Sequence, residues 1–153
     1  MKKSTKKVRI CGRILFVAYL LFALYVMFFS ESLDRTLVST EYRYNLTPFA
    51  EIERFWNMRH SYGWHVTLIN LLGNVICFVP FGFLIPTLSK NNVLNNFLSV
   101  TILAMAFSML IETTQLIAKV GAFDVDDIIL NTFGGLLGYV IFKLAKGIIR
   151  NKQ

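Results

Sequence analysis

Two short segments decide the fold of this chain: Ile111-Glu112-Thr113-Thr114-Gln115 and, after a short link, Asp124-Val125-Asp126-Asp127-Ile128-Ile129-Leu130-Asn131. Together they place four acidic residues and two amides between two long apolar runs, which otherwise exclude acidic residues. Placing a charged side chain in hydrocarbon is unfavourable by roughly 2.5–3.5 kcal/mol on insertion scales. We therefore expect these polar residues to have a functional or structural role at the edge of a membrane.

The composition predicts a membrane protein built as a single domain over residues 1–153. Of the 153 residues, 55% are hydrophobic and only 16% are charged, and the mean hydropathy is +0.55. Soluble domains carry about 25% charged residues. The net charge of +7 comes from Lys and Arg clusters beside apolar runs, so we expect membrane lipids and no nucleic acid as partners.

Four apolar runs predict an all-α polytopic membrane protein with four transmembrane helices. The runs cover about residues 10–29, 66–88, 97–118 and 127–144, close to the roughly 20 residues that a spanning helix needs. The basic arm at residues 1–13 resembles the start of a signal peptide. No small-x-small cleavage site follows it, so we predict that the first run is an uncleaved span.

Three residues within the spans predict local helix geometry. Pro80 removes a backbone donor and should kink the second span. Gly134 and Gly138 have the small-xxx-small spacing that lets helix backbones approach closely, within one chain or in a homo-oligomer.

The polar loop from Ser30 to Trp64 is predicted to contain a short interfacial helix. Its apolar residues Phe49, Ile52, Phe55 and Trp56 recur at helical spacing. With four spans, both termini lie on the same side as the short Ser89–Asn96 turn. That side carries most of the 16 basic residues and none of the 9 acidic ones, which predicts cytoplasmic termini and an outer long loop.

Polar residues are then predicted to converge at the outer ends of three spans. Glu112 and Gln115 share a face of the third span, because they are three residues apart. By the same rule, Asn70 and Asn74 share a face of the second span. Asp124, Asp127 and Asn131 share a face at the start of the fourth span if the helix begins that early. His65 lies at a similar depth on the second span. The candidate ligand-binding residues are Asn70, Asn74, Glu112, Gln115, Asp124, Asp127 and Asn131.

A purely structural role is the alternative for several of these residues. Asp124 or Asp126 suits the N-cap of the fourth span, where the helix dipole favours an acid. Asn70 and Asn74 suit hydrogen bonds to neighbouring helices. Glu112 needs a partner if it stays charged, and the candidates are Arg43, Arg54, Arg59 and Lys119.

The two cysteines, Cys11 and Cys77, lie at a basic flank and inside an apolar run. Neither position suits a disulfide or a metal site, and the chain has no CxxC motif, so packing roles are favoured. We predict no cofactor.

Several motifs resemble those of the VanZ-like family of small bacterial membrane proteins, with a core at residues 40–145. They are Asn45-Leu46-Thr47-Pro48-Phe49, Asn70-Leu71-Leu72-Gly73-Asn74, Phe78-Val79-Pro80-Phe81-Gly82, Glu112-Thr113-Thr114-Gln115, Phe123-Asp124-Val125-Asp126-Asp127, Asn131 and Gly134-Gly135. Many members carry an arginine shortly before the aspartates, where this chain has Gly121-Ala122. The resemblance implies a multi-pass protein of the cell envelope that is associated with teicoplanin resistance.

Three function classes fit these observations. The first is a non-enzymatic membrane protein whose acids and amides bind a lipid head group, a lipid-linked wall precursor or a lipoglycopeptide. The second is a membrane-embedded enzyme that modifies a lipid or a wall precursor, with Glu112 or Asp127 as acid/base and His65 assisting. Glu112, Asp124 and Asp127 are the candidate ligands if this enzyme uses a divalent cation. The third is an ion- or proton-coupled transporter in which Glu112 titrates.

Overall fold

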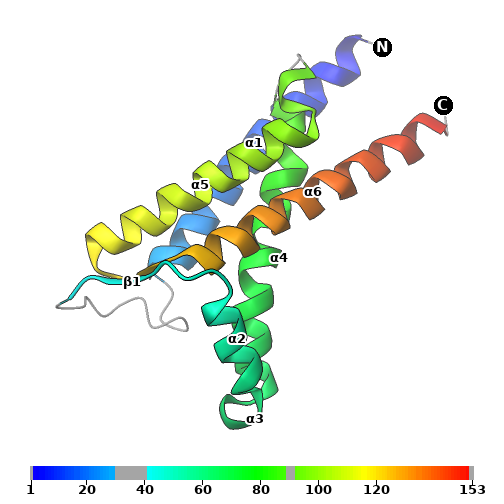
Figure 1. Cartoon of the computed structure of the whole chain (residues 1–153). Coiled ribbons are helices and arrows are strands. Elements are labelled where there is room, and N and C mark those ends of the chain that lie inside the picture. Colours follow the sequence, from blue (N-terminus) through cyan, green and yellow to red (C-terminus); the bar gives the residue numbers. More distant parts are fainter. Residues whose placement is uncertain (1, 30–40, 89–91, 152–153) are drawn as a thin grey trace.

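The predicted all-α polytopic fold is confirmed by a computed structural model that describes residues 2–29, 41–88 and 92–151. Within this described part, four helices are long and apolar enough to cross a membrane (Figure 1). They are α1 (Lys2–Phe29), α4 (Trp64–Leu88), α5 (Phe97–Ala118) and α6 (Val125–Asn151). Helices α1 and α6 extend beyond the predicted spans, because Lys and Arg are good helix formers and an apolar run does not fix where a helix ends.

Short elements fill the connections. The predicted helix in the long loop is α2 (Ala50–Asn57), and α3 (Arg59–Tyr62) and the 3₁₀ helix η2 (Asn92–Leu94) follow it in the chain. The start of that loop, residues 30–40, and turn residues 89–91 lie outside the described part.

Two strands were not predicted from the sequence. Strand β1 (Arg43–Asn45) pairs in parallel with β2 (Ala122–Asp124), and Asn45 is in register with Asp124. Strands of three residues are too short for the alternating pattern that identifies a strand in a sequence. The pairing joins the long loop to the acidic segment that precedes α6.

The polar elements gather at one end of the helical bundle. Figure 1 shows both termini at the opposite end, which also holds the end of α4 and the start of α5. Helices α2 and α3 lie beside the first part of α4, and strand β1 lies near the end of α1.

Helices α4 and α6 cross at close range (Figure 1). A Cβ atom on Gly82 would overlap the backbone carbonyl of Gly135, and Cβ atoms on Gly134 and Gly138 would overlap carbonyls of α4. Because α4 already covers Gly134 and Gly138, these two glycines are not available in this structure for contact with a second copy of the chain. Helix α4 itself continues through Pro80 and Pro86.

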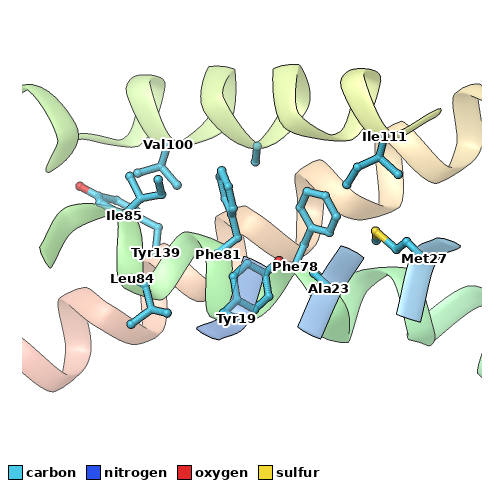
Figure 2. Packing of buried hydrophobic residues seen from close by; sticks show 11 residues of the cluster. Tyr19, Ala23, Met27, Phe78, Phe81, Leu84, Ile85, Val100, Ile111 and Tyr139 are labelled. Carbon is cyan, nitrogen blue, oxygen red and sulfur yellow. The ribbon is translucent and has the colours of Figure 1, made fainter. Parts of the chain in front are cut away.

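Aromatic side chains form the middle of the core (Figure 2). Phe81 stacks on Phe107 at 5.0 Å between ring centroids and contacts the ring of Tyr19 on α1. On α5, Val100 and Ala104 are fully buried. Many large apolar side chains on the outside of the four helices remain exposed, as contact with lipid requires.

Candidate functional site

A cavity of about 500 Å³ opens among the helices next to α2 and the two strands. We call it the acidic pocket. Its polar lining residues are Glu51, Arg54, Asn70, Asn74, Glu112, Gln115, Asp124, Asp126 and Asp127. Apolar side chains of α1, α4, α5 and α6 complete the lining, including Val26, Met27, Ile69, Cys77 and Leu130.

Asp124 caps helix α6. Its Oδ1 accepts a hydrogen bond from the N–H of Asp126 at 2.8 Å and another from the amide of Asn45 at 3.2 Å. An acceptor one residue before the helix satisfies a backbone donor that has no partner inside the helix. Burial raises the pKa of the Asp124 carboxyl, and the nearby Asp126 carboxylate adds to this, while the two hydrogen bonds oppose it.

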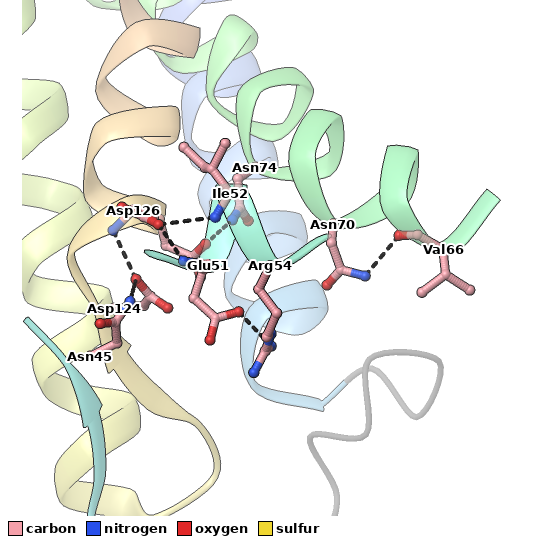
Figure 3. A network of polar contacts seen from close by, with 10 residues as sticks. Asn45, Glu51, Ile52, Arg54, Val66, Asn70, Asn74, Asp124 and Asp126 are labelled. Carbon is pink, nitrogen blue, oxygen red and sulfur yellow. Dashed lines mark hydrogen bonds and ion pairs between the residues drawn. The ribbon is translucent and has the colours of Figure 1, made fainter. Parts of the chain in front are cut away.

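Asp126 holds the start of a different helix. Its carboxylate accepts the N–H groups of Phe49 at 2.5 Å, Glu51 at 2.8 Å and Ile52 at 3.1 Å, as Figure 3 shows for the latter two. These donors lie at the N-terminus of α2, where the helix dipole favours an anion. The side chain is only 1% exposed, so Asp126 fixes α2 to α6 from inside the protein.

The contact between Asp126 and α2 was not predicted, because from the sequence Asp126 was considered only as a cap of its own helix. The sequence does carry one indication of it: helix α2 begins after Pro48-Phe49, which offers no capping side chain. In the structure, Phe49 has a left-handed φ of 67°. That conformation is unusual for a bulky residue and requires support from its surroundings. Asp126 supplies that support through the N–H of Phe49.

Glu112 is buried on α5, with 2% of its surface exposed. Its Oε2 accepts the N–H of Asp124 at 3.1 Å. Two of the four cations predicted as partners make other contacts: Arg54 pairs with Glu51 at 2.5 Å, and Arg59 lies over the rings of Trp56 and Trp64. Glu112 therefore connects α5 to the turn that begins α6.

Asp127 and Asn74 join two walls of the pocket. The amide of Asn74 on α4 donates to Oδ1 of Asp127 on α6 at 2.5 Å. Asn70 lies one turn earlier on α4 and donates to the carbonyl of Val66 at 2.9 Å (Figure 3). Both amides line the pocket, as does Asp127.

Gln115 lies against the end of α1. Its Nε2 donates to the carbonyl of Met27 at 2.8 Å, and the side chain is 1% exposed. Its Oε1 is buried and has no hydrogen-bond partner among the described residues. Such an unsatisfied buried acceptor is uncommon in native structures.

The structure thus brings together six of the seven candidate ligand-binding residues and leaves out Asn131. Asn131 donates to Ser108 Oγ at 2.8 Å, a contact between α6 and α5. His65 is exposed in the first turn of α4 and does not line the pocket.

The predicted set of metal ligands is not assembled. Glu112, Asp124 and Asp127 all line the pocket, but their oxygen atoms accept from different N–H donors. In the described part of the chain, no three His, Cys, Asp or Glu side chains lie close enough to hold a metal ion.

Acidic side chains predominate among the described residues that line the pocket. These residues include five carboxyl groups and one guanidinium, that of Arg54. Burial raises the pKa of the Glu51 carboxyl, and the carboxylates of Asp124 and Asp126 raise it further, while Arg54 lowers it.

Four spanning helices around a pocket rich in acidic side chains define a small polytopic membrane protein with a candidate binding site at one end of its bundle. The chain belongs to the VanZ/LLP1 family, whose sequence model matches residues 16–146. It is 34% identical over 110 residues to Protein VanZ of Enterococcus faecium. That match covers 71% of this chain and 58% of the relative, so the chain corresponds to little more than half of that protein. No solved structure matches it.

Proposed function

We propose that this protein contributes to resistance against teicoplanin-type glycopeptides by binding an amphiphilic ligand in the acidic pocket. The ligand is a lipid head group, a lipid-linked wall precursor or a lipoglycopeptide. Both termini would lie in the cytoplasm and the pocket would face outward. Membership of the VanZ/LLP1 family supports the phenotype, and the lining of the pocket supports the binding role.

The observation that carries the proposal is a pocket lining that contains both polar and apolar side chains. Its carboxyl groups come from α2, β2, α5 and α6, and its amides come from α4 and α5. Along α4 the lining runs from Ile69 to Cys77, which corresponds to about 12 Å of helix rise. An amphiphile combines the same two kinds of surface, a polar head and an apolar tail.

The distribution of basic residues supports the orientation. Arg13, Lys143, Lys146 and Arg150 lie on the parts of α1 and α6 nearest the termini. An excess of Lys and Arg marks the cytoplasmic side of a membrane protein. The pocket lies at the other end of the bundle, next to α2, and would open outside.

Growth in teicoplanin tests the proposal. A susceptible Gram-positive host would express the parent chain, Glu112→Gln or Asp127→Asn, at equal membrane abundance. We expect resistance from the parent and a return to host susceptibility in both variants, because each loses a pocket carboxylate. Glu53→Gln removes a carboxylate of α2 that does not line the pocket and should keep full resistance. Resistance in all variants would contradict the proposal.

A further inference from the structure

We infer that Trp56, Arg59 and Trp64 form a binding site for the phosphate group of a membrane phospholipid. The three residues come from the consecutive elements α2, α3 and α4, and none of them lines the acidic pocket. The inference therefore goes beyond the proposed function, and either can fail without the other. We call these three residues the Trp–Arg cluster.

Two indole rings surround the guanidinium of the cluster. Cζ of Arg59 lies 5.0 Å from the ring centroid of Trp56 and 5.7 Å from that of Trp64. Both distances are within the roughly 6 Å at which an aromatic face attracts a cation. The two rings also contact each other edge to face, with their centroids 6.1 Å apart. The cluster is thus a connected unit of three side chains.

The backbone fixes the position of the guanidinium. Nη1 of Arg59 donates a hydrogen bond to the carbonyl of Trp56 at 2.7 Å. Gly63 has a φ of 88°, a conformation that glycine adopts readily, and it lets the chain turn from α3 into α4. Since these contacts already hold the guanidinium, it loses less conformational freedom when a ligand binds.

The cluster lies at the end of an apolar span, at the depth of lipid head groups. Trp64 is the first residue of the spanning helix α4, and the exposed apolar side chains of Val66, Leu68 and Ile69 follow it. The rings of Trp56 and Trp64 are 52% and 47% exposed, so they are open to contact with lipid. Tryptophan rings concentrate at the interface between membrane and water, where lipid phosphates lie.

A phosphate group fits the chemistry of the cluster. A guanidinium whose faces lie against aromatic rings keeps N–H donors along its edge, and their planar arrangement matches two phosphate oxygens. The nearest other guanidinium in the chain, that of Arg54, already pairs with Glu51 at 2.5 Å. A phospholipid would place its phosphate on Arg59 and its acyl chains along the apolar side chains of α4.

The fluorescence of tryptophan gives a direct test, because the chain has two tryptophans and both belong to the cluster. The purified full chain is placed in dodecyl maltoside micelles, which contain no phosphate. Phosphatidylglycerol, phosphatidylcholine and diacylglycerol with the same brominated acyl chains are added at equal mole fractions. Bromine quenches tryptophan emission on contact, so quenching measures how strongly each lipid binds beside the cluster.

We expect both phospholipids to bind about fivefold more tightly than diacylglycerol, as for an exposed ion pair. Arg59→Gln should remove this preference when quenching is measured against the unquenched emission of the same variant. Arg43→Gln is the matched control: it removes an exposed arginine of β1 outside the cluster and should keep the preference of the parent. An excess of inorganic phosphate should leave the quenching unchanged, because it has no acyl chains.

Equal quenching by the three lipids, or no quenching by any of them, would overturn the inference and leave the acidic pocket untouched. A preference for phosphatidylglycerol alone would indicate attraction to net negative charge and would overturn recognition of the phosphate. Full displacement by inorganic phosphate would overturn the assignment to a lipid. An unchanged preference in folded Arg59→Gln would overturn the role of Arg59. The comparison of lipids on the parent chain tests the inference even where that variant does not fold.

Discussion

At the scale of single residues, Asp126 is the side chain that holds α2 in place at the pocket end of the bundle. It joins the first turn of α6 to the first turn of α2 through three N–H donors, and it is almost fully buried. Its carboxylate takes the place of the N-cap side chain that Phe49 lacks. The position of α2 against the pocket therefore depends on one residue of a different helix.

Replacing Asp126 should loosen α2 without unfolding the four spans. Asp126→Ala removes hydrogen bonds to a charged acceptor, which are each worth about 1.5–3 kcal/mol. We expect faster amide hydrogen exchange at Phe49, Glu51 and Ile52, with little change in the middle of α5. Glu53→Gln on the same helix should leave those exchange rates unchanged. Unchanged exchange in Asp126→Ala would contradict the role assigned to this carboxylate.

Residue spacing predicted much of the site, because residues three or four apart share a helix face. That rule placed Glu112 with Gln115 and Asn70 with Asn74, and all four line the pocket. It also placed Asn131 with Asp127, although Asn131 faces Ser108 on α5. Spacing gives the face of a residue on its own helix, but not which neighbour packs against that face.

At the scale of elements, apolar runs predicted the four spanning helices, and helical spacing predicted α2. The pairing of β1 with β2 was not predictable, since it joins Asn45 to Asp124 across most of the chain and involves only three residues on each strand. The same pairing places the loop motif at Asn45–Phe49 against the aspartates at Asp124–Asp127. Two motifs that are separate in the sequence are thus parts of one site.

The crossing of α4 and α6 depends on glycines whose hydrogen atoms face a backbone carbonyl. Gly82→Ala should destabilise the bundle by about 1–3 kcal/mol, because the added Cβ would overlap Gly135. Gly147→Ala on α6 is the control, since a Cβ there meets nothing within 4 Å. Alanine favours a helix more than glycine does, so this control should be as stable as the parent or more so. Thermal unfolding in detergent measures both, and equal Tm values would refute the close approach.

At the scale of the whole molecule, the pocket and the termini are expected to face opposite sides of the membrane. Figure 1 places the termini at one end and α2 and α3 near the other. Basic residues concentrate near the termini, which predicts that this end is cytoplasmic.

Cysteine labelling in intact cells tests that orientation. In a chain with Cys11→Ser and Cys77→Ser, we expect Ser61→Cys on α3 to react with a membrane-impermeant maleimide. Lys146→Cys on α6 should react only after the membrane is permeabilised. Both side chains are exposed in the structure, so neither result depends on burial. The reverse pattern would place the pocket in the cytoplasm.

The most direct test of the central claim is to fill the pocket without removing any of its polar groups. Gly73 lines the pocket, and a Cβ there would meet nothing within 4 Å, so Gly73→Leu should occupy the cavity without disturbing the fold. Gly147→Leu adds the same side chain at an open position on α6, outside the lining.

The measurement is growth in teicoplanin at equal membrane abundance and equal Tm. We expect Gly73→Leu to return the host to susceptibility, while Gly147→Leu retains the resistance of the parent. Full resistance from Gly73→Leu would contradict the claim that the pocket is the functional site.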